Sequence, residues 1–320
     1  MATLNDFFDV LQYGWMQRTV LAAILIGLIC SLIGVFIILR GMVFIGEAIA
    51  HSAFAGAALA LLLGFSDPLL VVLAFGIITA LGIGKSNELE KTNDEIIVAI
   101  FFSSFMGLGI FFIGLLPSFS SNVQAILFGR ILLITQRNVN LLILFSIITV
   151  AVIWLFKKEF YLLSFDKDLA RISGIPITLL NYIFLVLIAM AIDVSIFAIG
   201  AILVFAMLVI PAATAYQLTY NFDKMILLSI GFGIFSSVGG LVLSFLYDLP
   251  SGATIVLLST MVFVLVYSIS PKRTGLIKLL SRKEPIGFDH EPLPHFHGQT
   301  EGISKFSEHL KSIYPGTEEK

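Results

Sequence analysis

Apolar stretches of membrane-crossing length recur along this chain, separated by short polar or charged breaks. A helix needs roughly 20 apolar residues to cross a bilayer, and about nine stretches approach or reach that length. These candidate spans are Thr19–Leu39, Val43–Gly64, Leu69–Gly84, Glu95–Leu116, Asn140–Phe156, Leu179–Val194, Ile199–Leu218, Lys224–Leu246 and Ala253–Ser270. Backbone polar groups in lipid must be satisfied within the chain, which a helix achieves locally. The pattern therefore predicts an all-α, polytopic integral membrane protein with about eight or nine transmembrane helices.

The charge content supports the same class. Only 12% of the residues are charged and 58% are hydrophobic, whereas a soluble chain carries about 25% charged residues. The 19 Lys and Arg residues nearly balance the 21 Asp and Glu residues, so no basic surface for nucleic acid is expected. We expect a multi-pass protein of the plasma (inner) membrane that contacts lipid and has no nucleic-acid partner. The single cysteine, Cys30, excludes an internal disulfide and a Cys-based zinc site.

Charged breaks predict which ends of the spans face the cytoplasm. Lys and Arg gather in Lys85–Glu95, in Lys157–Arg171 and in the stretch after Pro271, and such residues near span ends mark the cytoplasmic side. Placing all three inside is consistent, because four spans lie between Lys157 and Pro271. The N-terminus then lies outside if five spans precede Lys157, and inside if four do.

Two segments fall outside the simple pattern of spans and loops. Pro117–Arg137 is too polar for a span and too apolar for a loop, which favours a re-entrant or interfacial helix. After Leu280 the chain becomes polar and Pro-containing, so we predict a transmembrane domain at 1–280 and a soluble, poorly ordered cytoplasmic tail at 281–320. The tail either binds metal loosely or carries incidental histidines, namely His290, His295, His297 and His309.

Glu47 and His51 are two ionisable residues inside an apolar span. Residues four apart lie on one face of a helix, and ionisable groups at membrane depth usually face a protein interior or a water-filled path. Carboxylate and imidazole are both ligands for divalent transition metals, so the pair is a candidate metal site on a transport path. The alternative is a buried Glu–His hydrogen bond that holds helices together.

Other polar and small residues within the spans favour structural roles. Asp193 lies near the predicted outer end of its span, which suggests an interfacial carboxylate. Helix packing and bending, rather than chemistry, are the roles expected for Gly200, Pro211, Gly231, Gly233, Gly239 and Gly240.

Motifs for catalysis and nucleotide binding are absent from the sequence. No G-x-x-x-x-G-K-[ST] phosphate-binding loop and no H-E-x-x-H zinc motif occurs. The chain is therefore not expected to be an enzyme. Energy for transport would come either from a separate ATPase or from an ion gradient that drives a secondary metal transporter.

Six segments, in order, resemble the permease subunit of the zinc/manganese/iron ABC importer family (ABC-3 type). They are GEAIAHSAFAG at 46–56, DEIIVAIFFS at 94–103, AILFGRILLIT at 125–135, SFDKDLARISG at 164–174, AIGAILVFAMLVIPAATA at 198–215 and DLPSG at 248–252. The resemblance implies a type II-like ABC importer permease fold. It also implies partners: a cytoplasmic ABC ATPase, an extracytoplasmic metal-binding protein and a second permease copy.

The resemblance implies roles for particular residues. Glu47 and His51 would bind the passing Zn, Mn or Fe ion together with the same pair of the second copy, and no cofactor would be bound permanently. Glu47 stands where Asp is common in the family, so the metal is not identified.

The segment Ser164–Gly174 would be the coupling helix that docks on the ATPase, with Ser164 or Asp166 as its N-cap and its end at Gly174. Its coupling residues would be Phe165, Asp166, Asp168, Leu169, Ala170 and Gly174. Asp248 would either receive the ion or its binding protein at the outer face, or serve only as a turn residue.

Overall fold

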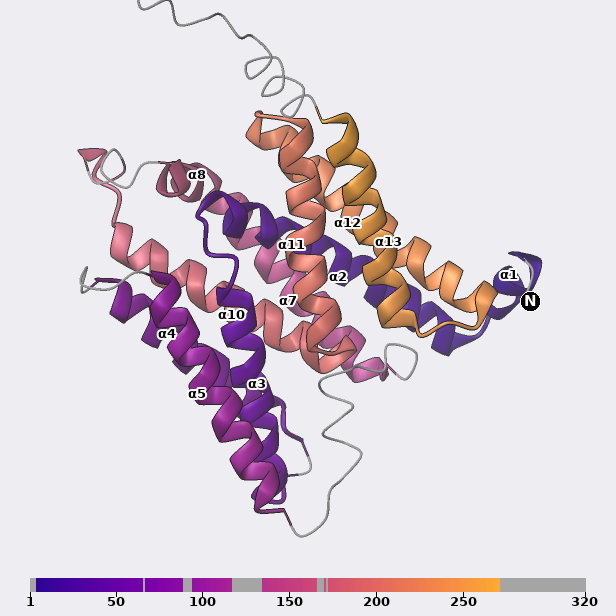
Figure 1. The fold of residues 1–320 in the computed structure, drawn as a ribbon, viewed down its shortest axis with the longest axis horizontal. Coiled ribbons are helices and arrows are strands. Elements are labelled where there is room, and N and C mark those ends of the chain that lie inside the picture. Colours follow the sequence, from indigo (N-terminus) through magenta and orange to yellow (C-terminus); the bar gives the residue numbers. More distant parts are fainter. Residues whose placement is uncertain are drawn as a thin grey trace, which may run out of the picture. The chain divides into compact units, whose positions relative to one another are not determined.

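The computed structural model describes residues 4–65, 67–88, 94–116, 134–165, 170 and 172–270, all within the first of two compact units, residues 1–275. In this part of the chain every regular element is a helix (Figure 1). The helices are α1 Leu4–Val10, α2 Gly14–Leu39, α3 Ile45–Leu62, α4 Leu69–Glu88, α5 Asp94–Gly114, α7 Gln136–Leu155, α8 Lys157–Phe165, α10 Ile177–Ile199, α11 Ala201–Leu218, α12 Phe222–Tyr247 and α13 Ser251–Ile269.

Nine of these helices are long and apolar enough to cross a membrane, which confirms the predicted all-α, polytopic class. They are α2, α3, α4, α5, α7, α10, α11, α12 and α13. The candidate span Leu69–Gly84 belongs to a 20-residue helix, α4. The predicted re-entrant segment falls mostly at 117–133, and the predicted tail at 281–320, both outside the described residues. The domain boundary at 280 therefore stays a prediction.

Helix α2 lies at the centre of the described bundle. It packs against α7, α11 and α12, while α3 packs against α4 and α5, and α10 against α4 and α7 (Figure 1). In the most apolar window of α2, 72% of the residues are buried, compared with 17% in α5 and 11% in α13. Helices α5 and α13 are therefore peripheral, with apolar faces left for lipid or for another chain.

Small residues let the central helices approach closely. A Cβ atom added at Gly34 on α2 would overlap the carbonyl oxygen of Leu208 on α11, and one at Gly233 on α12 would lie 2.5 Å from the carbonyl oxygen of Gly27. The Ser229 hydroxyl donates to the Ser31 carbonyl at 2.8 Å across the same α2–α12 contact. Close packing of this kind substitutes for the hydrophobic effect between helices in lipid. Gly231 is not at a close helix contact within the described part of the chain, because no atom there lies within 4 Å of a Cβ added at this position.

Ion pairs tie the links at the two ends of the bundle. Lys157, at the start of α8, pairs with Asp223 in the first turn of α12. Asp67, in the α3–α4 link, pairs with Arg137 in the first turn of α7. Each pair joins links that alternating spans would bring to one side of a membrane, which is the arrangement that the Lys and Arg distribution predicts.

The interpretation of Asp193 as an interfacial carboxylate is wrong. The residue is fully buried in α10. Neither carboxylate oxygen has a hydrogen-bond partner among the described residues. The carboxylate packs directly against Gly76 of α4, where an added Cβ would overlap it. Its position is thus a helix–helix contact in the interior of the bundle.

Candidate functional site

Helix α3 brings Glu47 and His51 together. The chain turns at Gly41, whose φ of +69° lies in the left-handed region that glycine adopts without strain, and α3 begins at Ile45. Glu47 lies in the first turn of α3, where the helix dipole favours a negative charge. The Nε2 atom of His51 lies 3.2 Å from the Oε1 atom of Glu47. The predicted pairing on one helix face is therefore found, while metal binding by the pair stays a prediction.

The His51 ring is fixed by a second helix. Phe102 on α5 meets it edge to face, with 4.5 Å between the ring centroids and an interplanar angle of 87°. The Nδ1 atom of His51 is buried and has no hydrogen-bond partner among the described residues. The imidazole is therefore oriented by Glu47 on one side and by an aromatic ring on the other.

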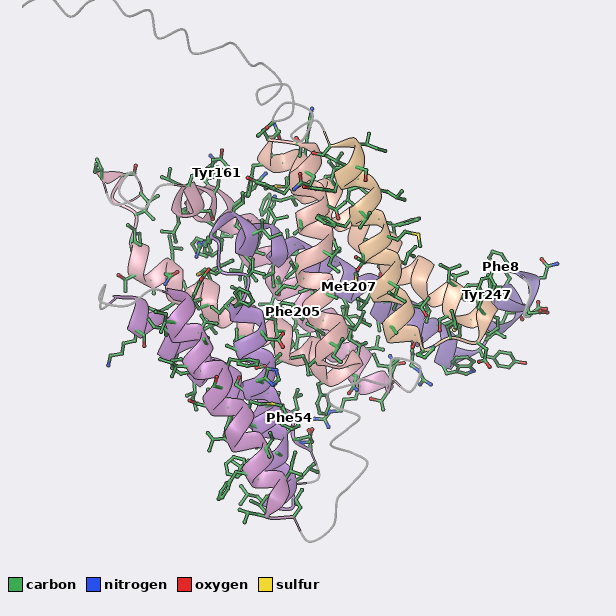
Figure 2. All side chains as sticks on the ribbon, viewed as in Figure 1. Phe8, Phe54, Tyr161, Phe205, Met207 and Tyr247 are labelled. Carbon is green, nitrogen blue, oxygen red and sulfur yellow. The ribbon has the colours of Figure 1, made fainter. Side chains whose placement is uncertain are left out.

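The pair lines a cavity of about 790 Å³ between α3, α5 and α11. The cavity residues are Phe44, Glu47, His51, Glu95, Ala99, Phe102, Met106, Ala201, Ile202 and Phe205. Figure 2 labels Phe205 among the side chains where α11 meets the start of α3. Its ring lies 3.8 Å from a Cβ atom added at Gly46. A mostly apolar cavity with a few polar groups is the usual form of a ligand site.

Glu95 is a cavity residue that the sequence analysis did not assign. It stands in the first turn of α5 and lines both the large cavity and a small adjoining one of about 20 Å³. The signal was present in the sequence as the acidic start of the 94–103 segment. What the sequence could not supply was the packing of α5 beside α3, which brings Glu95 to the same cavity as Glu47.

The position of the site along the bundle can be measured on α10. Gly46, next to Glu47, packs beside Ile192 of α10, 3.7 Å from its Cδ1 atom to an added Cβ. Ile192 lies fifteen residues beyond the first residue of α10, which is about 22 Å along the helix axis. Measured along α10, the site therefore lies within the membrane-crossing length of the bundle, although Glu47 itself stands in the first turn of α3.

The two donor atoms are spaced as ligands of one ion would be. Imidazole nitrogen and carboxylate oxygen bind zinc at about 2.1 Å. Two such donors stand about 3.0 Å apart at a right angle and about 3.4 Å apart at the tetrahedral angle, given bonds of that length. The observed 3.2 Å falls between these values. Among the described residues no group of three or more His, Cys, Asp or Glu side chains is close enough to hold a metal.

The predicted coupling segment is described only in part. Asp166, Asp168 and Leu169 lie outside the described residues. Phe165 ends α8 and is 59% exposed, whereas Ala170 is fully buried. Gly174 has a φ of +74°, and the Ile175 amide donates to the Ala170 carbonyl at 3.2 Å. This is the Schellman geometry of a helix end, so the predicted end at Gly174 is confirmed.

Ser164, one of the two predicted N-caps, is not a cap, while the alternative, Asp166, lies outside the described residues. The residue lies inside the last turn of α8, and its hydroxyl donates to the Phe160 carbonyl at 2.7 Å. Helix α8 begins at Lys157, before the predicted segment, and includes the stretch KKEFYLL. Tyr161 marks α8 at the edge of the described bundle (Figure 2).

Asp248 lies in a tight turn after α12. It is exposed, has a left-handed φ of +54°, and its amide donates to the Ser244 carbonyl. The Ser244 hydroxyl closes the turn by donating to the Leu249 carbonyl at 2.6 Å. The turn role is thus observed, and contact with an ion or a partner stays a prediction.

Among the described residues, nine helices are long and apolar enough to cross a membrane, and the cavity lined by Glu47 and His51 lies between α3, α5 and α11, as expected of a polytopic transport protein of the plasma membrane. The sequence pattern of the ABC 3 transport family matches residues 12–270. The chain belongs to this family, whose members are transport permeases rather than enzymes, as the sequence motifs predicted.

Relatives and a solved structure agree with this assignment. The manganese transport system membrane protein MntC of Listeria innocua is 36% identical over 87% of this chain and 97% of its own length. A probable iron transport system membrane protein of Haemophilus influenzae is 33% identical over 83% of this chain and 97% of its own. A chain in the structure of PsaBC from Streptococcus pneumoniae in complex with Fab matches with a TM-score of 0.77. It is 33% identical and covers 87% of this chain and 100% of that one.

Proposed function

We propose that this chain is the permease subunit of an ATP-driven importer of divalent transition-metal ions. The observation that carries the proposal is the Glu47–His51 pair, with donor atoms 3.2 Å apart, in a cavity at membrane depth. The names of the relatives mention manganese and iron, and zinc accepts the same ligands. We therefore include manganese, iron(II) and zinc as candidate ions, which are cargo and not resident cofactors.

An incomplete ligand set suits transport. An ion on a path must be bound well enough to enter and weakly enough to leave. Glu95 is the third candidate ligand, because it lines the cavity from α5. We propose that a second copy of this chain completes the coordination. The exposure of apolar side chains on the cavity rim supports this, with Phe44 60% and Ile202 56% exposed.

The energy source in this proposal is a cytoplasmic ABC ATPase that docks on the segment 164–174. The exposed Phe165 ring at the end of α8 supplies an apolar anchor of the kind that a partner groove receives. An extracytoplasmic metal-binding protein would deliver the ion at the opposite face. Asp248, exposed in its turn, is the candidate first contact there.

The experiment is metal uptake by the full complex in proteoliposomes. The wild-type permease, its ATPase and its binding protein are reconstituted. Uptake of radioactive manganese is then measured with ATP supplied on the side of the membrane that carries the ATPase. We expect Glu47→Ala and His51→Ala to lower uptake at least tenfold while the complex still assembles. Asp9→Ala, which removes a carboxylate on α1 that does not line the cavity, serves as the control and keeps the wild-type rate. Wild-type uptake in both cavity variants refutes the ligand roles.

A second condition separates ATP-driven transport from the gradient-driven alternative. An uncoupler is added to the same vesicles. Uptake that requires ATP and the binding protein, and continues with the uncoupler, supports the importer. Uptake that proceeds without ATP and stops with the uncoupler overturns the ATP-driven proposal in favour of a secondary transporter.

A further inference from the structure

Arg40 joins three helices at one end of the bundle. It follows directly after α2, and its guanidinium donates from Nε to the Ser164 hydroxyl of α8 at 3.3 Å. From Nη1 it donates to the Asn181 side-chain oxygen of α10 at 3.2 Å. The planar fork of an arginine makes two such bonds in fixed directions, which a lysine does not. One side chain therefore sets the positions of α8 and α10 relative to the end of α2.

Aromatic rings hold the same guanidinium on its faces. The Cζ atom lies 4.0 Å from the ring centroid of Phe184 and 6.0 Å from that of Phe160. Phe36 of α2 meets both rings, with centroids 5.9 Å and 6.1 Å away. Cation–π contacts are strongest where the cation is shielded from water. The Arg40 cluster, meaning Arg40 with Phe36, Phe160 and Phe184, is therefore a firm contact between α2, α8 and α10.

Arg40 is a cation whose polar contacts are neutral. Its two hydrogen-bond acceptors are a hydroxyl and an amide oxygen, and its Nη2 atom is buried without a partner among the described residues. Burial lowers the pKa of the Arg40 guanidinium to about 10, so the charge remains at neutral pH. Burying a charge is costly unless it is paired and hydrogen-bonded, and within the described part of the chain Arg40 has only two neutral hydrogen-bond acceptors. We therefore expect the role of Arg40 to lie in the hydrogen bonds that connect α2 to α8 and α10.

The chain directly after Arg40 forms a wall of the ion cavity. Gly41, Phe44 and Ile45 line the small cavity together with Glu95, and Phe44 and Glu95 also line the large one. We name residues 41–45 the inner-wall segment. Arg40 lies beside Phe184 of α10, and Gly46, just after the segment, lies beside Ile192 of the same helix. These two α10 residues are eight positions apart, so the segment runs about 12 Å along the axis of α10. Glu47 follows two residues later, in the first turn of α3, so the inner-wall segment connects Arg40 to the Glu47–His51 pair by a short stretch of backbone.

We propose that Arg40 is a positioning residue that couples α8 to the inner-wall segment, so that displacement of α8 moves a wall of the ion cavity. This inference rests on the proposed function, because it takes α8 to be the helix that leads into the ATPase-docking segment. Gly41, with its left-handed φ of +69°, is the joint at which the wall turns away from α2. Arg40 bonds to Ser164, at the start of the proposed docking segment, and acts on the ion cavity through the backbone of the inner-wall segment.

The test is the number of metal ions transported per ATP hydrolysed, measured for Arg40→Met in the reconstituted complex. We expect this ratio to fall about tenfold, while ATP hydrolysis and the amount of assembled complex stay within about twofold of wild type. A variant that merely folds less well lowers transport and hydrolysis together and leaves the ratio unchanged. The ratio therefore distinguishes a positioning role from a structural one.

Further variants keep the proposal falsifiable if Arg40→Met assembles poorly. Arg40→Lys keeps the charge but not the fork, and Asn181→Leu removes one acceptor; both should lower the ratio by a smaller factor. Arg137→Met removes an exposed arginine at the other end of the bundle and should keep the wild-type ratio. A wild-type ratio in Arg40→Met, or in both Arg40→Lys and Asn181→Leu, refutes the positioning role of Arg40 and leaves the proposed function standing. Transport by the wild-type complex that needs no ATP overturns the proposed function and this inference together.

Discussion

Glu95 on α5 and Glu47 on α3 line one cavity, although they belong to different helices and to different sequence motifs. Glu47 is paired with His51 on its own helix, whereas Glu95 has no hydrogen bond to any described residue. The geometry of any three-ligand set in this cavity therefore depends on how α5 sits against α3. That packing includes the Phe102–His51 contact, so both the imidazole and the second carboxylate, Glu95, are placed by α5.

Replacing Glu95 by Gln should weaken transport less than removing Glu47 or His51. The amide keeps the shape and an oxygen donor but loses the negative charge that favours a divalent ion. We expect the KM for manganese to rise about tenfold, equivalent to ~1.4 kcal/mol of binding free energy, with a smaller change in maximal rate. Uptake kinetics in proteoliposomes measure both, with Asp9→Asn as the control. An unchanged KM would show that Glu95 does not contact the ion.

Gly233 and Gly231 offer a matched pair on α12. A Cβ at Gly233 would lie 2.5 Å from the Gly27 carbonyl oxygen, while nothing lies within 4 Å of one at Gly231. Gly233→Ala should lower the free energy of unfolding by about 1–3 kcal/mol through overpacking. Gly231→Ala should leave it unchanged or raise it by up to about 1 kcal/mol, because alanine favours helix. Thermal unfolding in detergent measures the difference, and equal melting temperatures would contradict the close α2–α12 contact.

Most of the fold could be predicted from the sequence, because a chain that crosses lipid must form long apolar helices. Length and apolarity predicted the helices α2–α5, α7 and α10–α13 to within a few residues at most ends. Helix α8 was only partly anticipated, since its KKEFYLL start is too polar to read as a span and too short to show a clear period. The helical period located the Glu47–His51 pair, because that contact lies within one helix.

Contacts between helices were beyond the sequence. Asp193 was interpreted as interfacial from its distance along a span, but its burial depends on Gly76 of α4. Glu95 in the cavity and Arg40 between α8 and α10 likewise depend on packing partners distant in sequence. Apolar spans offer many faces of equal hydrophobicity, so nothing in one span indicates which face meets which neighbour.

Asp193 should be replaceable without loss of stability. Its carboxylate is fully buried and has no hydrogen-bond partner among the described residues, and an unpaired buried polar group costs about 1–3 kcal/mol. Asp193→Ala should therefore keep or raise the melting temperature of the purified permease. The exposed, paired Asp223 provides the comparison, and Asp223→Ala should change stability by no more than about 0.5 kcal/mol. A marked drop for Asp193→Ala would reveal a polar partner of the carboxylate.

Asp67 should contribute more to stability than the arginine it pairs with. Arg137 is largely exposed, and an exposed ion pair contributes about 0–1 kcal/mol. The Oδ1 atom of Asp67 also accepts from the Leu69 amide at 3.2 Å, at the start of α4, and losing such a cap costs about 1 kcal/mol more. We expect the melting temperature to fall further in Asp67→Ala than in Arg137→Ala, with Asp67→Asn close to Arg137→Ala because the amide keeps the acceptor. Unfolding of the three variants and the Asp67→Ala/Arg137→Ala double mutant separates the ion pair from the cap. Equal losses in Asp67→Ala and Arg137→Ala would mean that the cap contributes nothing.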